Sequence, residues 1–398
     1  MQLEQRLCRY FDSPHALLCP SGWEANVSLF STLPQPDDLI IYDSLIHASV
    51  HDGLRRSRAS SVPFEHNNVD HFGQVLRKHI PSLPSTANVF LAVETLYSMD
   101  GDFAPLSALL DEARAYIPSG SGRFFAFVDE AHSSGLYGAQ GSGLSCEWEL
   151  QNDPDLIRVC TFGKGFGASG AAILCQSELV RQYLINYARP LIFSTAMPHA
   201  GLVLVHAALD VLESAEGDQR RRRLRSNCAH LRQELQQALK EQGCYREVDG
   251  LLSLDREPEK HHSLDHRPSS RDQHRLGGQD QSSMVRAVCN AANLASDRSD
   301  PGPSPIMPLL TSHTDTRPLA TYLQQRGFLV RPITYPTVPL GKDRIRICVH
   351  ADNTAQEIQA LAYAVKEWIV EHSSMLSEET RTTTRANVSS QKQHGSKL

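Results

Sequence analysis

A single lysine surrounded by glycines is the strongest chemical signal in the sequence. Lys164 lies in the stretch 161–170, Thr-Phe-Gly-Lys-Gly-Phe-Gly-Ala-Ser-Gly, between short apolar runs at 156–160 and 171–175. Small residues on both sides of a lysine let a flat cofactor approach the backbone. Because an amine in such a place can form a Schiff base with a carbonyl group, we predict that Lys164 is a catalytic lysine.

Two phosphate-binding motifs and an ordinary turn compete with this interpretation. Gly165, Gly167 and Gly170 have the spacing of a dinucleotide fingerprint, but that motif is followed by a helix and the run 171–175 is typical of a strand. A Walker loop requires Ser or Thr directly after its lysine, where Gly165 stands. These residues alone do not exclude a glycine-rich turn with a solvated lysine. The choice between a turn and a catalytic lysine depends on the residues that accompany Lys164.

A carboxylate and a histidine follow the buried strand that the apolar run 124–128 predicts. Asp129 comes directly after this run, and His132 lies three residues further on. The carboxyl ends of strands face the crevice in which open α/β sheets bind ligands. Pyridoxal phosphate needs a carboxylate there, because a negative charge beside its pyridine nitrogen favours the protonated ring that takes up electrons. We predict these roles for Asp129 and, at the ring's phenolic oxygen, for His132, while Asp129 taken alone can be a strand-end turn residue.

Several motifs that occur in order along the chain resemble those of the α-oxoamine synthases. They lie at 21–26, 43–49, 94–102, 128–132, 161–170, 193–198 and 336–339. Members of this family are pyridoxal-phosphate enzymes of fold type I that condense an amino acid with an acyl-CoA and release carbon dioxide. The resemblance runs from residue 1 to about residue 250 and from about 304 to 371. It implies an α/β fold with a large domain, built on a mostly parallel seven-stranded sheet, and a smaller α+β C-terminal domain.

The resemblance also implies an activity and a set of site residues. It is strongest to the family members of biotin synthesis, which join L-alanine to pimeloyl-CoA and act as homodimers with shared active sites. Catalytic roles are implied for Lys164, His47, Asp129 and Glu94, with the His47 ring stacked on the cofactor. Contacts with the cofactor are implied for Gly22, Trp23, His47, Ser98, Asp129, His132, Thr161, Lys164, Ser194 and Thr195, and contacts with the substrates for Thr337 and Arg346.

Each of these motifs also has a structural interpretation that the sequence leaves open. Ser21 can be a helix N-cap, His47 a structural histidine at a strand end, and the stretch 98–102 a Gly/Asp turn. Basic and apolar residues alternate over 344–349, which predicts a strand with one face toward water. Arg346 can then be a surface arginine, although the paired donors of a guanidinium suit the carboxylate of an amino acid.

The sequence predicts two folded domains and one inserted segment. Residues 1–200 are expected to form the cofactor-binding large domain, and 201–252 with 304–372 the small domain and its connecting helices. The segment 253–303 is charged, rich in histidine and poor in apolar residues, so it cannot offset the entropy lost on ordering. We expect a disordered insertion there, with metal binding by its histidines as the less favoured alternative.

The C-terminal tail, residues 373–398, is polar and ends in Ser396-Lys397-Leu398. This terminal tripeptide is the address that a peroxisomal import receptor reads, and a flexible tail presents it well. We therefore expect the protein to be peroxisomal.

Composition excludes several classes of protein. A net charge of −6 gives no sign of a nucleic-acid or anionic membrane partner, and no apolar run is long enough to span a bilayer. The nine cysteines lack the spacing of a zinc site, so we expect no metal and a reducing compartment. Cys160, Cys175 and Cys348 lie in apolar runs and are expected to be buried.

Two rivals to the implied activity remain, and one expected part of the site is absent. Family members extend upstream of Met1 with a glycine-rich strand and turn that reach the substrate pocket. We expect the chain to lack this part, either because the gene model lost an exon or because the protein does. The enzyme can use another amino acid or acyl-CoA, or the chain can be a non-catalytic partner subunit. The joint presence of Lys164, Asp129 and His47 argues against the partner subunit, since a scaffold needs none of them.

Overall fold

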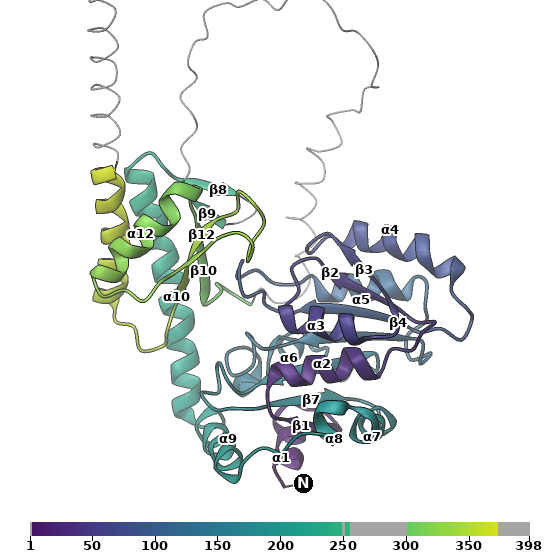
Figure 1. Cartoon of the computed structure of the whole chain (residues 1–398). Coiled ribbons are helices and arrows are strands. Elements are labelled where there is room, and N and C mark those ends of the chain that lie inside the picture. The colour runs from purple at the N-terminus through teal and green to yellow at the C-terminus, as the bar shows by residue number, and fades with distance from the viewer. Residues whose placement is uncertain (1, 249–250, 255–300, 373–398) are drawn as a thin grey trace, which may run out of the picture.

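The computed structural model describes residues 2–248, 251–254 and 301–372. Within them the chain forms a large α/β domain and a smaller α+β domain, which the long helix α10 (Ala215–Glu241) joins (Figure 1). This architecture confirms the predicted fold class. The predicted insertion falls almost wholly outside the described residues, and the predicted tail falls wholly outside them.

The large domain is built on a seven-stranded sheet whose order is β1-β7-β6-β5-β4-β2-β3. β2 to β6 pair in parallel, whereas β7 is antiparallel to both of its neighbours. The carboxyl ends of β2 to β6 therefore meet at one edge, where ligands bind in such sheets. The strands are β1 (His15–Cys19), β2 (Leu39–Asp43), β3 (Ser60–Phe64), β4 (Val89–Glu94), β5 (Phe124–Asp129), β6 (Leu156–Thr161) and β7 (Ala171–Cys175).

Helices cover both faces of this sheet, which explains the unbroken apolar runs of its central strands. In β4, Leu91 and Val93 belong to one apolar cluster with α4 and α5, while Phe90 and Ala92 belong to a second cluster with α2 and α3. The helices are α2 (Gly22–Thr32), α3 (Ala48–Arg56), α4 (Val69–His79) and α5 (Leu106–Arg114).

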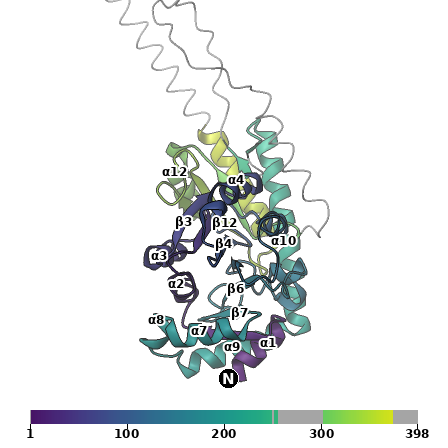
Figure 2. The ribbon, with the colours of Figure 1, turned by 90° about the vertical axis from the view of Figure 1, so that its right-hand side faces the viewer.

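At the β1 end of the sheet, α1 and α9 pack over β1, β6 and β7 and support the lysine loop (Figure 2). α1 and α9 form an apolar cluster with Phe162 and Phe166, and the Phe166 ring stacks on Phe11 with 6.0 Å between centroids. The remaining helical elements of the large domain are α1 (Gln2–Tyr10), α6 (Leu144–Glu147), α7 (Glu178–Tyr187), α8 (Arg189–Ile192), α9 (His199–Leu212) and the short 3-10 turns η1 (Ile80–Ser82) and η2 (Ala139–Gly141). The first helix of the chain therefore packs directly against the loop that carries Lys164.

The small domain contains a five-stranded sheet with the order β11-β12-β10-β9-β8. Apolar side chains of α10, α12 and the helical stretch 355–372 pack on it, among them Leu235, Leu323 and Val365. The elements are β8 (Arg246–Val248), β9 (Leu251–Ser253), β10 (Ile306–Leu310), α12 (His313–Gln325), β11 (Arg331–Ile333) and β12 (Arg344–Cys348). Across the described residues, no helix combines the length and apolar composition that a membrane span needs.

The arginines of β12 face the large domain, so the prediction of a face toward water is wrong. Arg344 is 2% exposed, donates to the carbonyl oxygen of Met99 and pairs with Asp100. Alternation shows which residues share a face but not what covers that face. The contact continues at Gly101, whose φ is +66° and where a Cβ atom would lie 2.0 Å from the carbonyl oxygen of Ile306.

Two of the three cysteines predicted to be buried are buried. Cys160 and Cys175 have neighbours on both sides in the large sheet, whereas Cys348 is exposed because it ends β12 at the surface. The cysteines of the described residues are all free thiols.

A half-buried histidine ties the end of β2 to the loop that follows β4. His66 Nδ1 lies 2.9 Å from Asp43 Oδ1, and its Nε2 lies 2.8 Å from Asp102 Oδ2. Burial lowers the pKa of His66, but its hydrogen bonds with Asp102 and Asp43 outweigh this and raise it to about 10. Ligand atoms of His66, Asp100 and Asp102 lie within 4.8 Å of one another. A doubly protonated imidazole is a donor at both nitrogens, however, and offers no lone pair to a metal.

Replacing His66 by glutamine is expected to destabilise the protein by about 2 kcal/mol near pH 6, the scale of a hydrogen bond to a charged group. The pKa of His66 is about 10 in the folded protein and about 6.5 in an unfolded chain. The stabilisation is therefore complete below the unfolded pKa and declines as pH rises toward the folded one. Urea unfolding from about pH 6 to about pH 9 should show the difference shrinking. His79→Gln, in the neighbouring helix α4, is the control, and a difference that does not change with pH contradicts the assignment.

Candidate active site

Two carboxyl groups stand side by side at the ends of β4 and β5. Glu94 and Asp129 are opposite each other in the register of the sheet, and both are buried. Asp129 accepts the amide of Asn26 at 2.8 Å through Oδ2 and the backbone N–H of Ala131 at 2.9 Å through Oδ1. Burial raises the pKa of Glu94 well above its usual range, and the negative charge of Asp129 raises it further. Glu94 therefore favours its neutral form, while Asp129 has the donors that a carboxylate needs.

The lysine loop joins β6 to β7 as a tight connection and brings the amine to the same edge. Lys164 Nζ lies 2.8 Å from Nε2 of His132, which follows Asp129 on the next strand of the sheet. A strand, β7, follows the loop, so the dinucleotide fingerprint is excluded. A solvated turn does not account for the contact between the lysine amine and His132.

Burial is the main influence on the pKa values of Lys164 and His132, and it lowers both. The side chain of Lys164 as a whole is exposed, but its amine contacts His132, and local burial of the amine lowers its pKa. Burial also lowers the pKa of His132 to about 2, helped by the positive charges of Lys164 and Arg346. His132 is therefore neutral, and the lowered pKa of Lys164 makes the uncharged amine, which is the nucleophilic form, easier to reach.

His47 caps helix α3 and lies half-buried near the same carboxylate. Its Nδ1 accepts the backbone N–H of Ser49 at 3.2 Å and lies 2.8 Å from the Ser49 hydroxyl. An acceptor at Nδ1 leaves the proton of the neutral ring on Nε2. Burial lowers the pKa of His47, so the neutral ring is favoured. The Trp23 ring meets the His47 ring edge to face with centroids 5.9 Å apart, and this contact brings the start of α2 to the site.

Gly22 and Thr161, two residues predicted at the cofactor phosphate, are neighbours in space. A Cβ atom on Gly22 would lie 3.3 Å from both Cβ and Oγ1 of Thr161. Ser21 is the N-cap of α2, because its hydroxyl accepts the backbone N–H of Glu24 at 3.1 Å. The helix start beyond it presents backbone N–H groups of the kind that bind phosphate.

Arg346 reaches this site from the small domain. Its Nη1 donates to the carbonyl oxygen of Ser98 at 3.2 Å, and its buried Nε has no hydrogen-bond partner among the described residues. Burial has the largest effect on the pKa of Lys164 and lowers it, while Asp129 and Glu94 raise it. The positive charge of Arg346 has a smaller effect and lowers it. The guanidinium is therefore near enough to the lysine amine for its charge to act there.

Three predicted residues are exposed in loops. Ser194 and Thr195 are exposed in the loop between α8 and α9. Thr337 is exposed in the turn after β11, where its backbone N–H donates to the carbonyl oxygen of Thr334. The roles of these three residues stay predictions.

A family model described as aminotransferase class I and II matches residues 1–365. The chain belongs to this family. Within it the chain is an α-oxoamine synthase, and pyridoxal phosphate is the cofactor of these enzymes.

The synthase is similar over most of its length to curated proteins of fungi and bacteria. 8-Amino-7-oxononanoate synthase of Emericella nidulans is 36% identical over 373 residues, which are 92% of this chain and 77% of that protein. The enzyme of the same name from Haemophilus ducreyi is 32% identical over 360 residues, covering 90% of this chain and 76% of that one. Aminoacyl transferase sphA of Aspergillus fumigatus is 29% identical over 367 residues, covering 90% and 68%.

Solved structures share the fold of the synthase. Serine palmitoyltransferase from S. paucimobilis, a structure with bound PLP, has a TM-score of 0.70 at 23% identity and covers 92% of this chain and 75% of that one. 8-Amino-7-oxononanoate synthase from Francisella tularensis has a TM-score of 0.64 at 23% identity, covering 93% and 87%.

Sequence reasoning assigned no role to two polar residues of the synthase that contact predicted site residues. Asn26 is 3% exposed on α2 and donates to Asp129, while Ser49 lies between Asn26 and His47. Asn26 stands between the buried residues Ala25 and Val27. A buried asparagine needs hydrogen-bond partners. The signal in the sequence was therefore a polar residue between two apolar ones on a helix.

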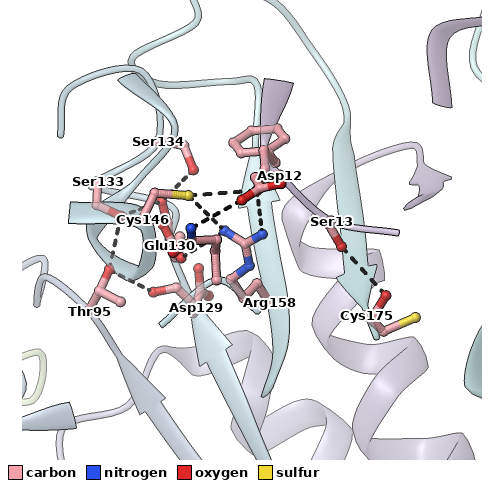
Figure 3. Close-up of polar contacts among 12 residues, drawn as sticks. Asp12, Ser13, Thr95, Asp129, Glu130, Ser133, Ser134, Cys146, Arg158 and Cys175 are labelled. Atoms are coloured by element: carbon pink, nitrogen blue, oxygen red, sulfur yellow. Dashed lines mark hydrogen bonds and ion pairs between the residues drawn. The ribbon is translucent and has the colours of Figure 1, made fainter. Parts of the chain in front are cut away.

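A buried ion pair backs the loop that carries Asp129 and His132 in the synthase (Figure 3). Arg158 on β6 is 1% exposed, lies 3.8 Å from Glu130 and donates to the carbonyl oxygen of Phe11 at 2.7 Å. The Ser133 hydroxyl donates to Glu130 and contacts Thr95, so the network also reaches the end of β4. The charged pair thus links the end of α1 to the loop of Asp129.

Proposed function

We propose that this chain catalyses the decarboxylative condensation of L-alanine with pimeloyl-CoA, which yields 8-amino-7-oxononanoate, CoA and carbon dioxide. The observation that carries the proposal is the convergence of Lys164, His132, Asp129, His47 and Arg346 at one edge of the sheet. The similarity to two proteins named 8-amino-7-oxononanoate synthase supports the choice of substrates.

The residues present fit pyridoxal phosphate. Asp129 offers a carboxylate with two fixed donors, Lys164 offers an amine of lowered pKa, and the helix start at Gly22 lies against Thr161 without an intervening side chain. When bound, this cofactor supplies an electron sink for the electron pair released at the amino acid's α-carbon.

Each residue of the cluster then has a defined task. Lys164 would hold the cofactor through Nζ, and the same amine would take the proton from the α-carbon of the amino acid. Asp129 would keep the pyridine nitrogen protonated, and His47 would pack against the ring. Arg346 binds the carboxylate of the amino acid through the paired donors of its guanidinium.

A matrix of amino acids and acyl-CoA thioesters tests the proposal. The purified chain with pyridoxal phosphate is incubated with L-alanine, L-serine or glycine and with pimeloyl-CoA, palmitoyl-CoA or succinyl-CoA, and release of free CoA is measured. A preference for L-alanine with pimeloyl-CoA supports the proposal. A preference for another pair supports a different α-oxoamine synthase, which the similarity to aminoacyl transferase sphA keeps as the second candidate. No turnover with any pair points to a non-catalytic partner subunit.

Replacing Arg346 by lysine is expected to raise KM for the amino acid by about tenfold to a hundredfold, because paired donors become a single ammonium. The kcat value should change less, since Arg346 binds the substrate and moves no proton. Steady-state kinetics with the amino acid varied measures this split. Arg317→Lys, on the exposed face of α12, is the matched control. An unchanged KM removes Arg346 from the substrate site.

We also propose that the chain forms a homodimer in which Ser194 and Thr195 reach the partner's site. Both are exposed, and the apolar side chains of Leu179, Tyr187 and Phe193, which precede them in the chain, are 77%, 61% and 71% exposed. A mass near twice 44.2 kDa by light scattering supports this, and a fully active monomer contradicts it.

For location, we propose the peroxisome, with Ser396-Lys397-Leu398 as the signal that the import receptor binds. A fluorescent protein that carries residues 373–398 should enter peroxisomes, and the same fusion without the last three residues should not. Identical distribution of both fusions contradicts the proposal.

A further inference from the structure

We propose that Asn26 is a positioning residue that fixes Asp129 and His47 in a single arrangement around the cofactor. The inference rests on the proposed function, because it concerns how two cofactor-facing groups of that site are oriented. Its basis is a continuous chain of hydrogen bonds from one group to the other.

The two hydrogens of the Asn26 amide go to two different partners. Nδ2 donates to Asp129 Oδ2 at 2.8 Å and to Ser49 Oγ at 2.9 Å. An ionised carboxylate only accepts hydrogen bonds, so the nitrogen and not the oxygen of the amide has to face Asp129. The amide orientation is therefore dictated by Asp129.

This orientation decides the direction of the next hydrogen bond. Because Ser49 Oγ accepts from Asn26, its own hydrogen is free for His47 Nδ1, 2.8 Å away. His47 Nδ1 then receives the Ser49 hydroxyl and the Ser49 backbone N–H, which holds the ring proton on Nε2. Asn26 thus sets the carboxylate directly and the imidazole through one hydroxyl.

Burial makes the arrangement rigid. Asn26 is 3% exposed, and Ser49 is fully buried, so water is not at hand to replace a lost donor. Asn26 and Asp129 are 103 residues apart in sequence, and the bond joins helix α2 to the end of β5. The side chain of Asn26 on α2 consequently holds two groups that belong to other elements: Asp129 at the end of β5, and, through Ser49, His47 at the start of α3.

Three variants of the full chain test this assignment. Asn26→Leu removes both donors at similar size, and Ser49→Ala removes only the arm to His47. Ser28→Ala is the control, because Ser28 is buried two residues further along α2 and its hydroxyl has no hydrogen-bond partner among the described residues. Two quantities are measured: the dissociation constant of pyridoxal phosphate by absorbance titration, and the titration midpoint of His47 before cofactor is added. The midpoint comes from mass spectrometry of deuterium exchange at the histidine C2 position, and Asp129, Lys164 and His51 are the other charged groups that it senses.

Asn26→Leu is expected to raise the dissociation constant by about tenfold or more. Hydrogen bonds donated to Nδ1 favour neutral histidine, so Asn26→Leu and Ser49→Ala should both raise the His47 midpoint, by about half a unit to one unit. Ser49→Ala should weaken cofactor binding less than Asn26→Leu, since the bond to Asp129 stays. Ser28→Ala should change neither quantity.

The assignment is overturned if Asn26→Leu binds the cofactor as wild type does and both variants keep the wild-type midpoint. A purely structural role would lower the melting temperature without moving the midpoint. If Asn26→Leu does not fold, Ser49→Ala decides alone, and an unchanged midpoint overturns the assignment. Failure of the wild-type chain to bind pyridoxal phosphate is a separate result, because it overturns the proposed function whatever the His47 midpoints are.

Discussion

Replacing Lys164 by alanine is expected to lower kcat by at least about a thousandfold, the upper range for loss of a general base. The reason is that Nζ of Lys164 has two tasks, holding the cofactor and moving the α-proton, and no other amine contacts His132 in the described part of the chain. The same change should abolish the visible absorption band that pyridoxal phosphate gives with the wild-type chain. Absorbance and CoA release, measured on the same preparations, check both statements.

Lys78→Ala, on the exposed face of helix α4, is the matched control and should leave both quantities unchanged. The melting temperature of Lys164→Ala should stay close to that of wild type, because the side chain as a whole is exposed. A Lys164→Ala chain that keeps a tenth or so of wild-type activity would exclude Lys164 as the catalytic lysine, because a lost general base costs about a hundredfold or more.

Replacing Arg158 by methionine is expected to lower the free energy of unfolding by about 3–5 kcal/mol, the range for breaking a buried ion pair. The substitution leaves Glu130, which is fully buried, without its opposite charge, and it removes the donor to the carbonyl of Phe11. Burial already raises the pKa of Glu130. Protonation neutralises the stranded carboxyl group, so the deficit should be smaller near pH 5 than near pH 8 when measured by urea unfolding.

The double variant Arg158→Met with Glu130→Gln separates charge from packing. It removes the uncompensated charge and should recover a substantial part of the lost stability at neutral pH. A single Arg158→Met variant that loses less than about 1 kcal/mol, the scale of an exposed pair, would show that the two charges do not stabilise each other.

Local sequence signals predicted the strands that carry the site, because those strands are buried on both faces. β7 and the first five residues of β5 appear as unbroken apolar runs, and Asp129, the last residue of β5, is a polar group at the ligand edge. Lys164 and Asp129 were predictable for the same reason, since each lies at or shortly after the carboxyl end of a strand that its apolar run identifies in the sequence.

Groups that work through distant contacts were not predictable in this way. The partners of Asn26 lie 23 and 103 residues away, and the carbonyl that Arg346 binds lies 248 residues away. A single sequence records that Asn26 is polar and lies among apolar neighbours, but it does not record which buried group faces it. The face of β12 was misjudged for the same reason, since the large domain takes the place of solvent there.

The contact between β12 and the loop after β4 is made largely by backbone atoms, and this determines which positions of that loop can change during evolution. Arg346 and Arg344 bind the carbonyl oxygens of residues 98 and 99, which every amino acid possesses. The side chain at 99 is therefore free to drift without loosening the two domains. At position 101 the opposite holds, because any Cβ atom would collide with the backbone of Ile306. Gly101 and Asp100, whose carboxylate pairs with Arg344, thus carry the sequence constraint for a junction that two arginines make.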